Sequence, residues 1–405
     1  MQDPRSERAA TAYRGDNGTS MTDVNRRSGV ATPTTPSELR VVTLDPISDY
    51  ARWEGFLRSH ADAHLYHHPS WLEVLARSFG YEGATLAVED GERRIAGLLP
   101  LVLARNRRGR ILLSSLPHTL RAGPLVRNDE ALIALLDAAV QLVSGNRGRL
   151  VLKVNSTFPG HSAADFIRVP RDATYIRALP AQADELRFGD SRNHGAIARG
   201  VRKAEREGME IRAATSVTDV HAWYRLYLEA MRAHAVPPRP LRFFVAAWES
   251  LAELGMMRLL LAENMQFGHR SLLAGSIFFM FHDTVFYAFN GRIDSALRLR
   301  ANDVILWHAI DAAWRDGFRL FDFGDVSESQ RGLASYKMKW GAVATPLYRY
   351  HHPRLALRDK VLRPESGAHK LAGITWHRLP LRATVLIGEL LYRDSAVSAG
   401  KGRNA

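Results

Sequence analysis

Two arginines and an asparagine stand where a long apolar helix is expected to begin. Arg298 and Arg300 directly precede the apolar segment 302–315, whose polar edge carries His308, a residue that we expect to face water. A helix start offers free backbone N–H groups and the positive end of the helix dipole, and guanidinium groups add charge-assisted hydrogen bonds. We therefore expect Arg298, Arg300 and Asn302 to bind a phosphate or pyrophosphate. For Asn302 we favour the alternative that it only caps the helix.

A second set of cations recurs at helical spacing of three and four residues, so it forms one face of an expected helix. Its members are Arg199, Arg202, Lys203 and Arg206. Such a face suits an anionic substrate, for example a nucleotide or a lipid pyrophosphate. The alternative is a solvated face that Glu205 and Glu207 neutralise, although these acids point partly elsewhere around the helix.

Asp322 and Asp325 flank a glycine at the end of the expected strand 318–323. The carboxyl ends of strands are where α/β sheets place their ligands. Asp322 alternates with two phenylalanines, so its side chain faces away from both of them. It either orients an amine substrate or pairs with Arg319 or a neighbouring backbone group, and the pattern leaves both open.

The elements that must position these residues occur twice along the chain, which points to an internal repeat. Both halves read as two strands joined by a turn, a third strand, a helix and a closing strand. In the first half these are residues 84–89, 95–104, 111–116, 130–143 and 149–154, and in the second 257–262, 272–281, 285–289, 302–315 and 318–323. We therefore expect an α/β fold with two similar domains of mixed sheets and flanking helices, the alternative being a chance similarity of two ordinary α/β segments.

Composition narrows the chemistry. The chain has 405 residues and no cysteine, which excludes a thiol nucleophile and any thiolate metal site. The histidine pairs 67–68 and 351–352 are adjacent residues, which diverge by about 100° on a helix, so we expect no metal. The net charge of +13 favours an anionic partner or reflects only an arginine-rich surface.

No apolar run reaches the roughly 20 residues that span a bilayer, and residues 2–27 are polar rather than a secretory signal. We expect a cytoplasmic protein. Residues 1–38 have the composition of a disordered tail. Residues 376–393 mix aromatic, apolar and arginine side chains, so they either lie at the inner face of the membrane or pack back on their own domain.

Three segments resemble the Fem-like family, the peptidoglycan-bridge aminoacyltransferases and their relatives in the GNAT acyltransferase superfamily. The segments are Ser-Ser-Leu-Pro-His at 114–118 with Ala-Gly-Pro-Leu at 122–125, the basic segment 198–208, and the series formed by 297–302, Phe-Asp-Phe-Gly at 321–324 and Gly-Leu-Ala-Ser-Tyr-Lys-Met-Lys-Trp-Gly at 332–341. The resemblance covers residues 40–350. It implies two tandem GNAT-like domains, which we place at 39–188 and 189–352, with a basic amphipathic C-terminal tail at 353–405.

The resemblance also implies roles for single residues. The family has a functional lysine after an aromatic residue at the place of Lys337, where it stabilises developing negative charge or binds a phosphate. We assign this catalytic role to Lys337, add Asp322 as the second catalytic candidate, and keep Lys339 as a substrate-binding residue. In the superfamily the position of Arg298, Arg300 and Asn302 holds the phosphates of the donor.

The implied donor is acyl-CoA or aminoacyl-tRNA. Family members that use aminoacyl-tRNA often carry a long helical hairpin in the second domain, whereas the expected helices 220–233 and 241–254 are joined by a short proline-rich turn. This departure weakens the tRNA interpretation. We expect transfer of an acyl or aminoacyl group to an amine of a peptidoglycan or polysaccharide precursor, an anionic or lipid-linked acceptor. The alternatives are acyl-CoA-dependent N-acetylation of a small molecule and a non-catalytic module that binds RNA or a membrane.

Overall fold

The computed structural model describes residues 39–105, 111–144, 148–160, 164–264, 271–327, 329–353, 376 and 379–398. Residues 38–405 form one of two compact units, and the account below concerns that unit. The expected tail 1–38 and the first part of the expected C-terminal tail, residues 354–375, lie outside the described residues.

The first half of the unit contains seven strands and three α-helices among its described residues. In chain order they are β1 (Arg40–Leu44), α1 (Tyr50–Ser59), η1 (Leu65–His67), α2 (Pro69–Phe79), β2 (Glu82–Glu89), β3 (Ile95–Arg105), β4 (Ile111–Ser114), β5 (Leu125–Val126), α3 (Asp129–Ser144), β6 (Arg149–Val154) and β7 (Ile167–Ala178). The helix α3 packs its apolar face on β2, β3 and β6, and the buried leucines and valines there form one core.

The second half continues with a similar series and ends on a C-terminal helix. Its elements are η2 (Ala183–Glu185), α4 (His194–Arg206), β8 (Met209–Ala213), α5 (Val217–Ala233), α6 (Leu241–Leu251), β9 (Met257–Asn264), β10 (Ser271–Phe281), β11 (Thr284–Arg292), α7 (Ser295–Arg298), α8 (Ala301–Arg315), β12 (Leu320–Val326), α9 (Arg331–Lys339), β13 (Val343–His352) and α11 (Leu381–Ser398). The helix α8 is buried against β8, β9 and β10, as its nearly continuous apolar sequence predicts.

The expected repeat of strands and helices is present. In the first half β2–β3 and β3–β4 pair antiparallel and β4–β6 pair parallel around α3. In the second half β9–β10 and β10–β11 pair antiparallel and β11–β12 pair parallel around α8. The prediction of a mixed α/β fold is therefore confirmed, with element ends that differ from the expected ones by a few residues.

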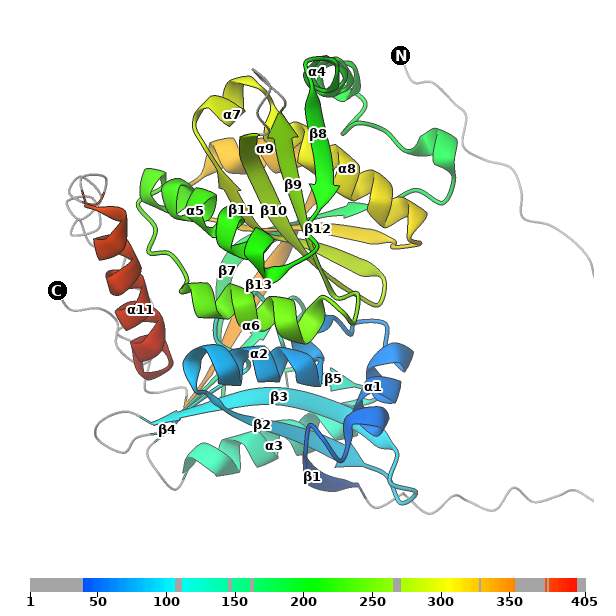
Figure 1. Ribbon diagram of the computed structural model, residues 1–405. Coiled ribbons are helices and arrows are strands. Elements are labelled where there is room, and N and C mark those ends of the chain that lie inside the picture. Colours follow the sequence, from blue (N-terminus) through cyan, green and yellow to red (C-terminus); the bar gives the residue numbers. More distant parts are fainter. Residues whose placement is uncertain are drawn as a thin grey trace, which may run out of the picture. The chain divides into compact units, whose positions relative to one another are not determined.

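Two strands connect the halves in a way that the sequence pattern did not indicate. β7, which precedes the expected domain boundary, pairs with β12 of the second half. β13, from the end of the second half, pairs with both β7 and β6. The result is one sheet of the order β1-β2-β3-β4-β6-β13-β7-β12-β11-β10-β9-β8. A core of aromatic residues also joins the halves, where α2 packs against α6 (Figure 1).

The C-terminal helix α11 packs back on the rest of the unit, beside α5 and β3 (Figure 1). Gly388 allows this approach, because a Cβ there would lie 2.2 Å from the carbonyl oxygen of Pro238. On its other side Leu386 and Leu390 remain 62% and 63% exposed. Among the described residues, no helix is long and apolar enough to cross a membrane.

Candidate active site

A cavity of about 590 Å³ opens where β11, the end of β12, α5 and α9 converge. Aromatic side chains form a large part of its walls, and its polar groups include Asp322, Asp325, Lys337, Asn302 and Arg239. Three of these were selected from the sequence as site residues, so the fold brings Asp322, Lys337 and Asn302 to one space. Asp325 was noted from the sequence beside Asp322, and Arg239 was missed.

Asp322 is fully buried and its carboxylate is bound on both oxygens. Oδ2 forms an ion pair with Nη1 of Arg121 at 3.1 Å, and Oδ1 accepts hydrogen bonds from the Thr174 hydroxyl at 2.5 Å and the Gly324 backbone N–H at 2.8 Å. The sequence left open whether Asp322 orients an amine or pairs with Arg319 or a neighbouring backbone group. The structure shows the backbone contact, to Gly324, and the cationic partner is Arg121 rather than Arg319. Through these contacts the Asp322 side chain links the loop after β4, the strand β7 and the turn at the end of β12.

Lys337 lies on α9 with its side chain folded beneath that turn. Its Nζ donates hydrogen bonds to the carbonyl oxygens of Gly324 at 2.9 Å and Asp325 at 3.0 Å. Gly324 has φ 78°, a left-handed conformation that glycine adopts without strain, and this turns its carbonyl toward the lysine. Burial lowers the pKa of Lys337 to about 8, and the nearby Asp325 and Asp322 carboxylates oppose the shift.

Asp325 lies between the main cavity and a second, smaller pocket of about 50 Å³, because it lines both. Arg171 and Arg349 line the smaller pocket with it. Burial raises the pKa of Asp325, and the charge of Lys337 partly counters that effect. A carboxyl group whose pKa is raised is a better base than an ordinary carboxylate and is suited to accept a proton from a substrate amine.

The start of α8 differs from the sequence expectation at Asn302. The N-cap residue is Arg300, with φ 55°, and the helix begins at Ala301, so the prediction that Asn302 caps the helix is wrong. Instead, Oδ1 of Asn302 accepts a hydrogen bond from Nδ2 of Asn290 at 3.1 Å, and Asn302 lines the cavity. The cause is the left-handed turn at Arg300, which starts the helix two residues earlier than the capping pattern assumed.

Arg300 and Lys339 meet at a buried aspartate, Asp303, which was not selected from the sequence. Asp303 receives a hydrogen bond from the Tyr336 hydroxyl at 2.9 Å and lies 3.5 Å from Nη1 of Arg300 and 3.9 Å from Nζ of Lys339. The side chain of Arg300 is 47% exposed, and Arg298 beside it is also exposed. Both retain free donor capacity toward solvent, so this end of α8 can bind an anion.

The four cations of α4 are exposed, as expected for a binding face, but none of them lines the cavity. Lys203 lies 3.7 Å from Glu207, while Glu205 pairs with the partly exposed His308 of α8. Gly200 of α4 lies directly on Arg300, since a Cβ there would be 2.7 Å from Nη1 of the arginine. The basic face of α4 therefore adjoins the start of α8.

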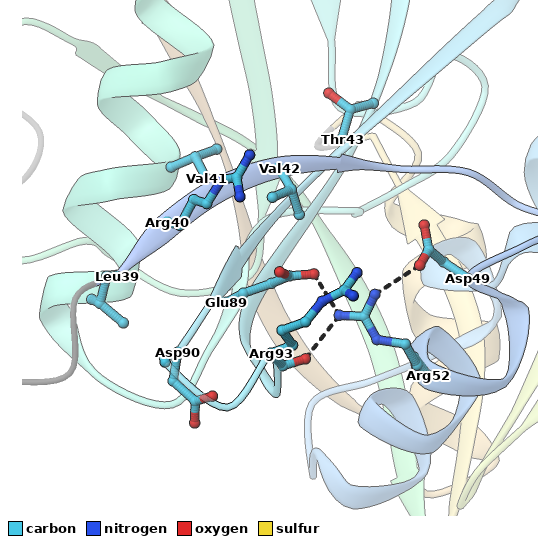
Figure 2. Close-up of a pocket in the computed structure, with 11 residues that line it drawn as sticks. Leu39, Arg40, Val41, Val42, Thr43, Asp49, Arg52, Glu89, Asp90 and Arg93 are labelled. Atoms are coloured by element: carbon cyan, nitrogen blue, oxygen red, sulfur yellow. Dashed lines mark hydrogen bonds and ion pairs between the residues drawn. The ribbon is translucent and has the colours of Figure 1, made fainter.

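A larger hollow of about 940 Å³ lies alongside β1, at the edge of the sheet. In Figure 2 the guanidinium of Arg52 is seen between Glu89, Asp49 and the backbone oxygen of Arg93. Arg52, Asp49 and Glu89 thus satisfy one another, and none of the site residues selected from the sequence lies there. We therefore place the chemistry in the cavity of about 590 Å³ that Lys337 and Asp322 line.

Among the described residues, no group of three or more histidine, aspartate and glutamate side chains could hold a metal ion. The cavity is lined by cations, carboxyl groups and the hydrogen-bonded amide side chains of Asn290 and Asn302. These groups suit acyl transfer, in which negative charge develops on a carbonyl oxygen and an amine loses a proton.

The family model of the acetyltransferase (GNAT) domain matches residues 191–338, which include α8, β12 and Lys337. Residues 191–338 are therefore similar to a GNAT acetyltransferase domain. Its structure is also similar to that of FemX, with a TM-score of 0.64 and 14% identity over 76% of this chain and 96% of the other. No curated protein matches the sequence.

Two further similar structures have the same fold at lower similarity. One is the C-terminal domain of a putative lysylphosphatidylglycerol synthetase from Agrobacterium fabrum, with a TM-score of 0.52 and 11% identity over 78% of this chain and 94% of that domain. The other is L-PGS from Bacillus licheniformis, with a TM-score of 0.51 and 14% identity over 81% and 97%. The predictions of a Fem-like GNAT fold and of an N-acyltransferase are confirmed. The boundaries 39–188 and 189–352 and the individual site residues stay predictions.

Proposed function

We propose that this GNAT enzyme transfers an acyl or aminoacyl group from an activated donor to an amine of a cell-envelope precursor. The observation that carries the proposal is the position of Lys337. Its Nζ lies at the end of β12, inside the cavity that also receives Asn302 from the start of α8. A cation placed there is close to both the expected donor site and a space large enough for an acceptor.

The donor binds at the start of α8 in this proposal. Arg298, Arg300 and Lys339 supply positive charge, and the adjoining basic face of α4 extends it. We therefore move Arg199, Arg202 and Lys203 from the acceptor to the phosphate groups of the donor. Acyl-CoA and aminoacyl-tRNA both carry such phosphates, so this surface suits either.

The chemistry follows from the groups at the end of β12. The protonated acceptor amine gives one proton to Asp325, and the resulting neutral amine attacks the donor carbonyl carbon, forming a C–N bond. The charged Nζ of Lys337 stabilises the oxyanion of the tetrahedral intermediate. The intermediate collapses with loss of the donor's thiol or alcohol, which takes the second amine proton. Asp322 has both carboxylate oxygens engaged, so we assign it to positioning the Gly324 turn.

The envelope acceptor is supported by the structural neighbours. Lysylphosphatidylglycerol, the product named for one of them, joins an amino acid to a membrane phospholipid. An acceptor of this kind is reached from the cytoplasm, where acyl-CoA and aminoacyl-tRNA are available. The exposed leucines of α11 give the protein an apolar face that can touch the inner side of a membrane.

A second candidate is acyl-CoA-dependent acetylation of a small molecule. One observation favours it: α5 and α6 are of ordinary length and are separated only by residues 234–240, so no helical hairpin is inserted there. The two candidates differ in the donor and in the size of the acceptor.

The test is a donor screen with the purified protein. Radiolabelled acetyl-CoA, longer acyl-CoA and aminoacyl-tRNA are each offered with lipid-linked and soluble envelope precursors and with small amines. Label transferred to a precursor, and lost in Lys337→Met, supports the proposal. Transfer only to small amines from acyl-CoA establishes the second candidate, and no transfer from any donor contradicts both.

A further inference from the structure

Arg239 is held rigidly on the wall of the cavity by the turn between α5 and α6. The turn has the sequence Pro-Pro-Arg-Pro, in which the prolines fix the backbone dihedral φ. The backbone N–H of Arg239 donates to the Tyr227 hydroxyl at 3.1 Å, and its carbonyl oxygen accepts from the Tyr224 hydroxyl at 2.9 Å. Both tyrosines belong to α5, so the arginine cannot drift relative to that helix.

The guanidinium group sits among aromatic rings from three elements. Its Cζ lies 4.8 Å from the ring centre of Phe243 in α6, 5.0 Å from Phe289 in β11 and 5.7 Å from Tyr392 in α11. Its Nη2 donates to the carbonyl oxygen of His118 at 3.0 Å. The cation–π contacts and this one hydrogen bond orient the guanidinium group without neutralising its charge.

The remaining terminal nitrogen has no partner. Nη1 of Arg239 is buried and makes no hydrogen bond, and no ion pair within the described part of the chain includes Arg239. Leaving a buried charge uncompensated is costly, and the usual resolution is a bound counter-charge. Since the side chain lines the cavity, that counter-charge can come from a ligand in it.

We propose that the Arg239 guanidinium binds a carboxylate of the acceptor, so that the acceptor is an aminocarboxylate with its amine turned toward Asp325. This inference rests on the proposed function, because it names the acceptor class for the same cavity. A carboxylate suits the site better than a phosphate, because the groups around the guanidinium are aromatic rings and one carbonyl oxygen rather than further cations, whereas phosphates are bound by several donors.

The rim of the cavity indicates the rest of the acceptor. Three of the large apolar side chains exposed on the protein line this cavity: Val236 is 41% exposed, Leu297 56% and Leu333 42%. Exposed apolar groups gathered at the mouth of a pocket mark a surface that an apolar ligand covers. The acceptor is therefore amphipathic, with its carboxylate inside and apolar atoms near the rim.

The test measures binding alone. Ligand-observed NMR titrations use three probes that share a phenyl ring: phenylacetate, phenyl phosphate and the neutral 2-phenylethanol. The wild type should bind phenylacetate more tightly than the other two. In Arg239→Leu the affinity for phenylacetate should fall about 10- to 100-fold, the range expected for a hydrogen bond to a charged group. The affinity for 2-phenylethanol should hardly change.

The matched control is Arg315→Leu, which removes an exposed arginine whose partner is Asp311 at the far end of α8. It should leave all three affinities unchanged. If Arg239→Leu does not fold by near-UV circular dichroism, Arg239→Lys keeps the cation and should still weaken phenylacetate binding several-fold, because a point charge cannot reproduce the guanidinium geometry.

Equal binding of phenylacetate and 2-phenylethanol, or an unchanged phenylacetate affinity in the folded Arg239 variant, overturns the inference. Tighter binding of phenyl phosphate that depends on Arg239 also overturns it and makes the site a phosphate site. These titrations require no turnover. A failed donor screen therefore leaves their outcome intact, and a negative titration leaves the proposed acyl transfer standing.

Discussion

Lys337 is the residue on which the proposed chemistry depends most. If its charge stabilises the oxyanion, Lys337→Met should lower kcat by about 10²–10³, the loss seen when one oxyanion donor is removed. The KM should hardly change, because the interaction strengthens only as charge develops. Lys337→Arg should recover little activity, since a planar guanidinium cannot reach both the Gly324 and Asp325 carbonyls from the same place. Steady-state kinetics on the donor–acceptor pair found by the screen checks this.

The nearby Lys339 is the control for that experiment at the same helix. Its Nζ lies near Asp303 rather than beneath the β12 turn, so Lys339→Met should raise the KM of the donor and spare kcat. A folded Lys337→Met protein with near wild-type kcat would remove Lys337 from the catalytic step. A raised KM alone would make it a binding residue.

The pH dependence of stability reports on the same lysine. Because burial depresses the pKa of Lys337 to about 8, the folded protein releases the lysine proton more readily than the unfolded chain, whose lysine pKa is near 10.5. The unfolded state therefore binds more protons between these values, and this lysine adds stability as the pH rises through that window.

Between pH 7 and pH 10 the free energy of unfolding of wild type should consequently rise relative to Lys337→Met, by about 1–3 kcal/mol. The hydrogen bonds lost in Lys337→Met lower the free energy of unfolding by the same amount at both pH values. The change in the difference between the two proteins therefore isolates the ionisation of Lys337. Urea denaturation of both proteins at the two pH values gives the difference. A constant difference across the range would show that the charge of Lys337 is as well solvated in the folded protein as in the unfolded chain.

Lys337 was selected because the segment around it resembles the Fem-like family, and the cations at the start of α8 were selected because arginines stand before an apolar helix. Sequence reasoning could not find Arg121 or Arg239. Arg121 is 201 residues away from Asp322 in the chain, and only the folded sheet brings the two together. Arg239 lies in a proline-rich turn, and its environment of rings comes from α6, β11 and α11.

At the scale of elements, the start of α8 is the expected donor site. Arg300→Ala should weaken donor binding by about 1–3 kcal/mol, the scale of a hydrogen bond to a charged group. Arg315→Ala, at the other end of the same helix, is the matched control and should have no effect on the donor. Calorimetric titration with the donor identified by the screen measures both. Equal affinities for the two variants would place the donor phosphates elsewhere.

The ion pair of Arg121 and Asp322 fastens β12 to the first half. Asp322 is fully buried, so Arg121→Met leaves a carboxylate without its cation and should destabilise the protein by about 3–5 kcal/mol. Replacing both residues, as Arg121→Met with Asp322→Leu, should recover part of this loss because no buried charge remains. Urea denaturation of the two variants checks the expectation, and a double variant as unstable as the single one would contradict it.

The periodicity of the sequence predicted most elements of the two halves, because buried strands and an apolar helix have local signatures. It did not indicate β7 and β13 or their partners, since strand pairing across the chain leaves no local signal. β7 lies between β12 and β13, and β13 lies between β7 and β6. Each half therefore depends on a strand that the linear boundary at residue 188 assigns to the other.

For the whole molecule, the pairing of β7 and β13 across the boundary at residue 188 predicts that the second half does not fold alone. A fragment of residues 189–352 lacks β7, so β12 loses its antiparallel partner and Asp322 loses both Arg121 and Thr174. Its β13 loses both neighbours, β6 and β7, and would remain as an unpaired strand that invites aggregation.

The fragment should show no cooperative urea transition. Adding β7, as residues 164–352, restores the pairing of β12 and should raise helix and strand content by circular dichroism, while the absent β6 still leaves one side of β13 open. The chain from residue 39 should unfold in one transition with all strands paired. Cooperative unfolding of residues 189–352, at a midpoint near that of the longer chain, would contradict this and establish the second half as an independent domain.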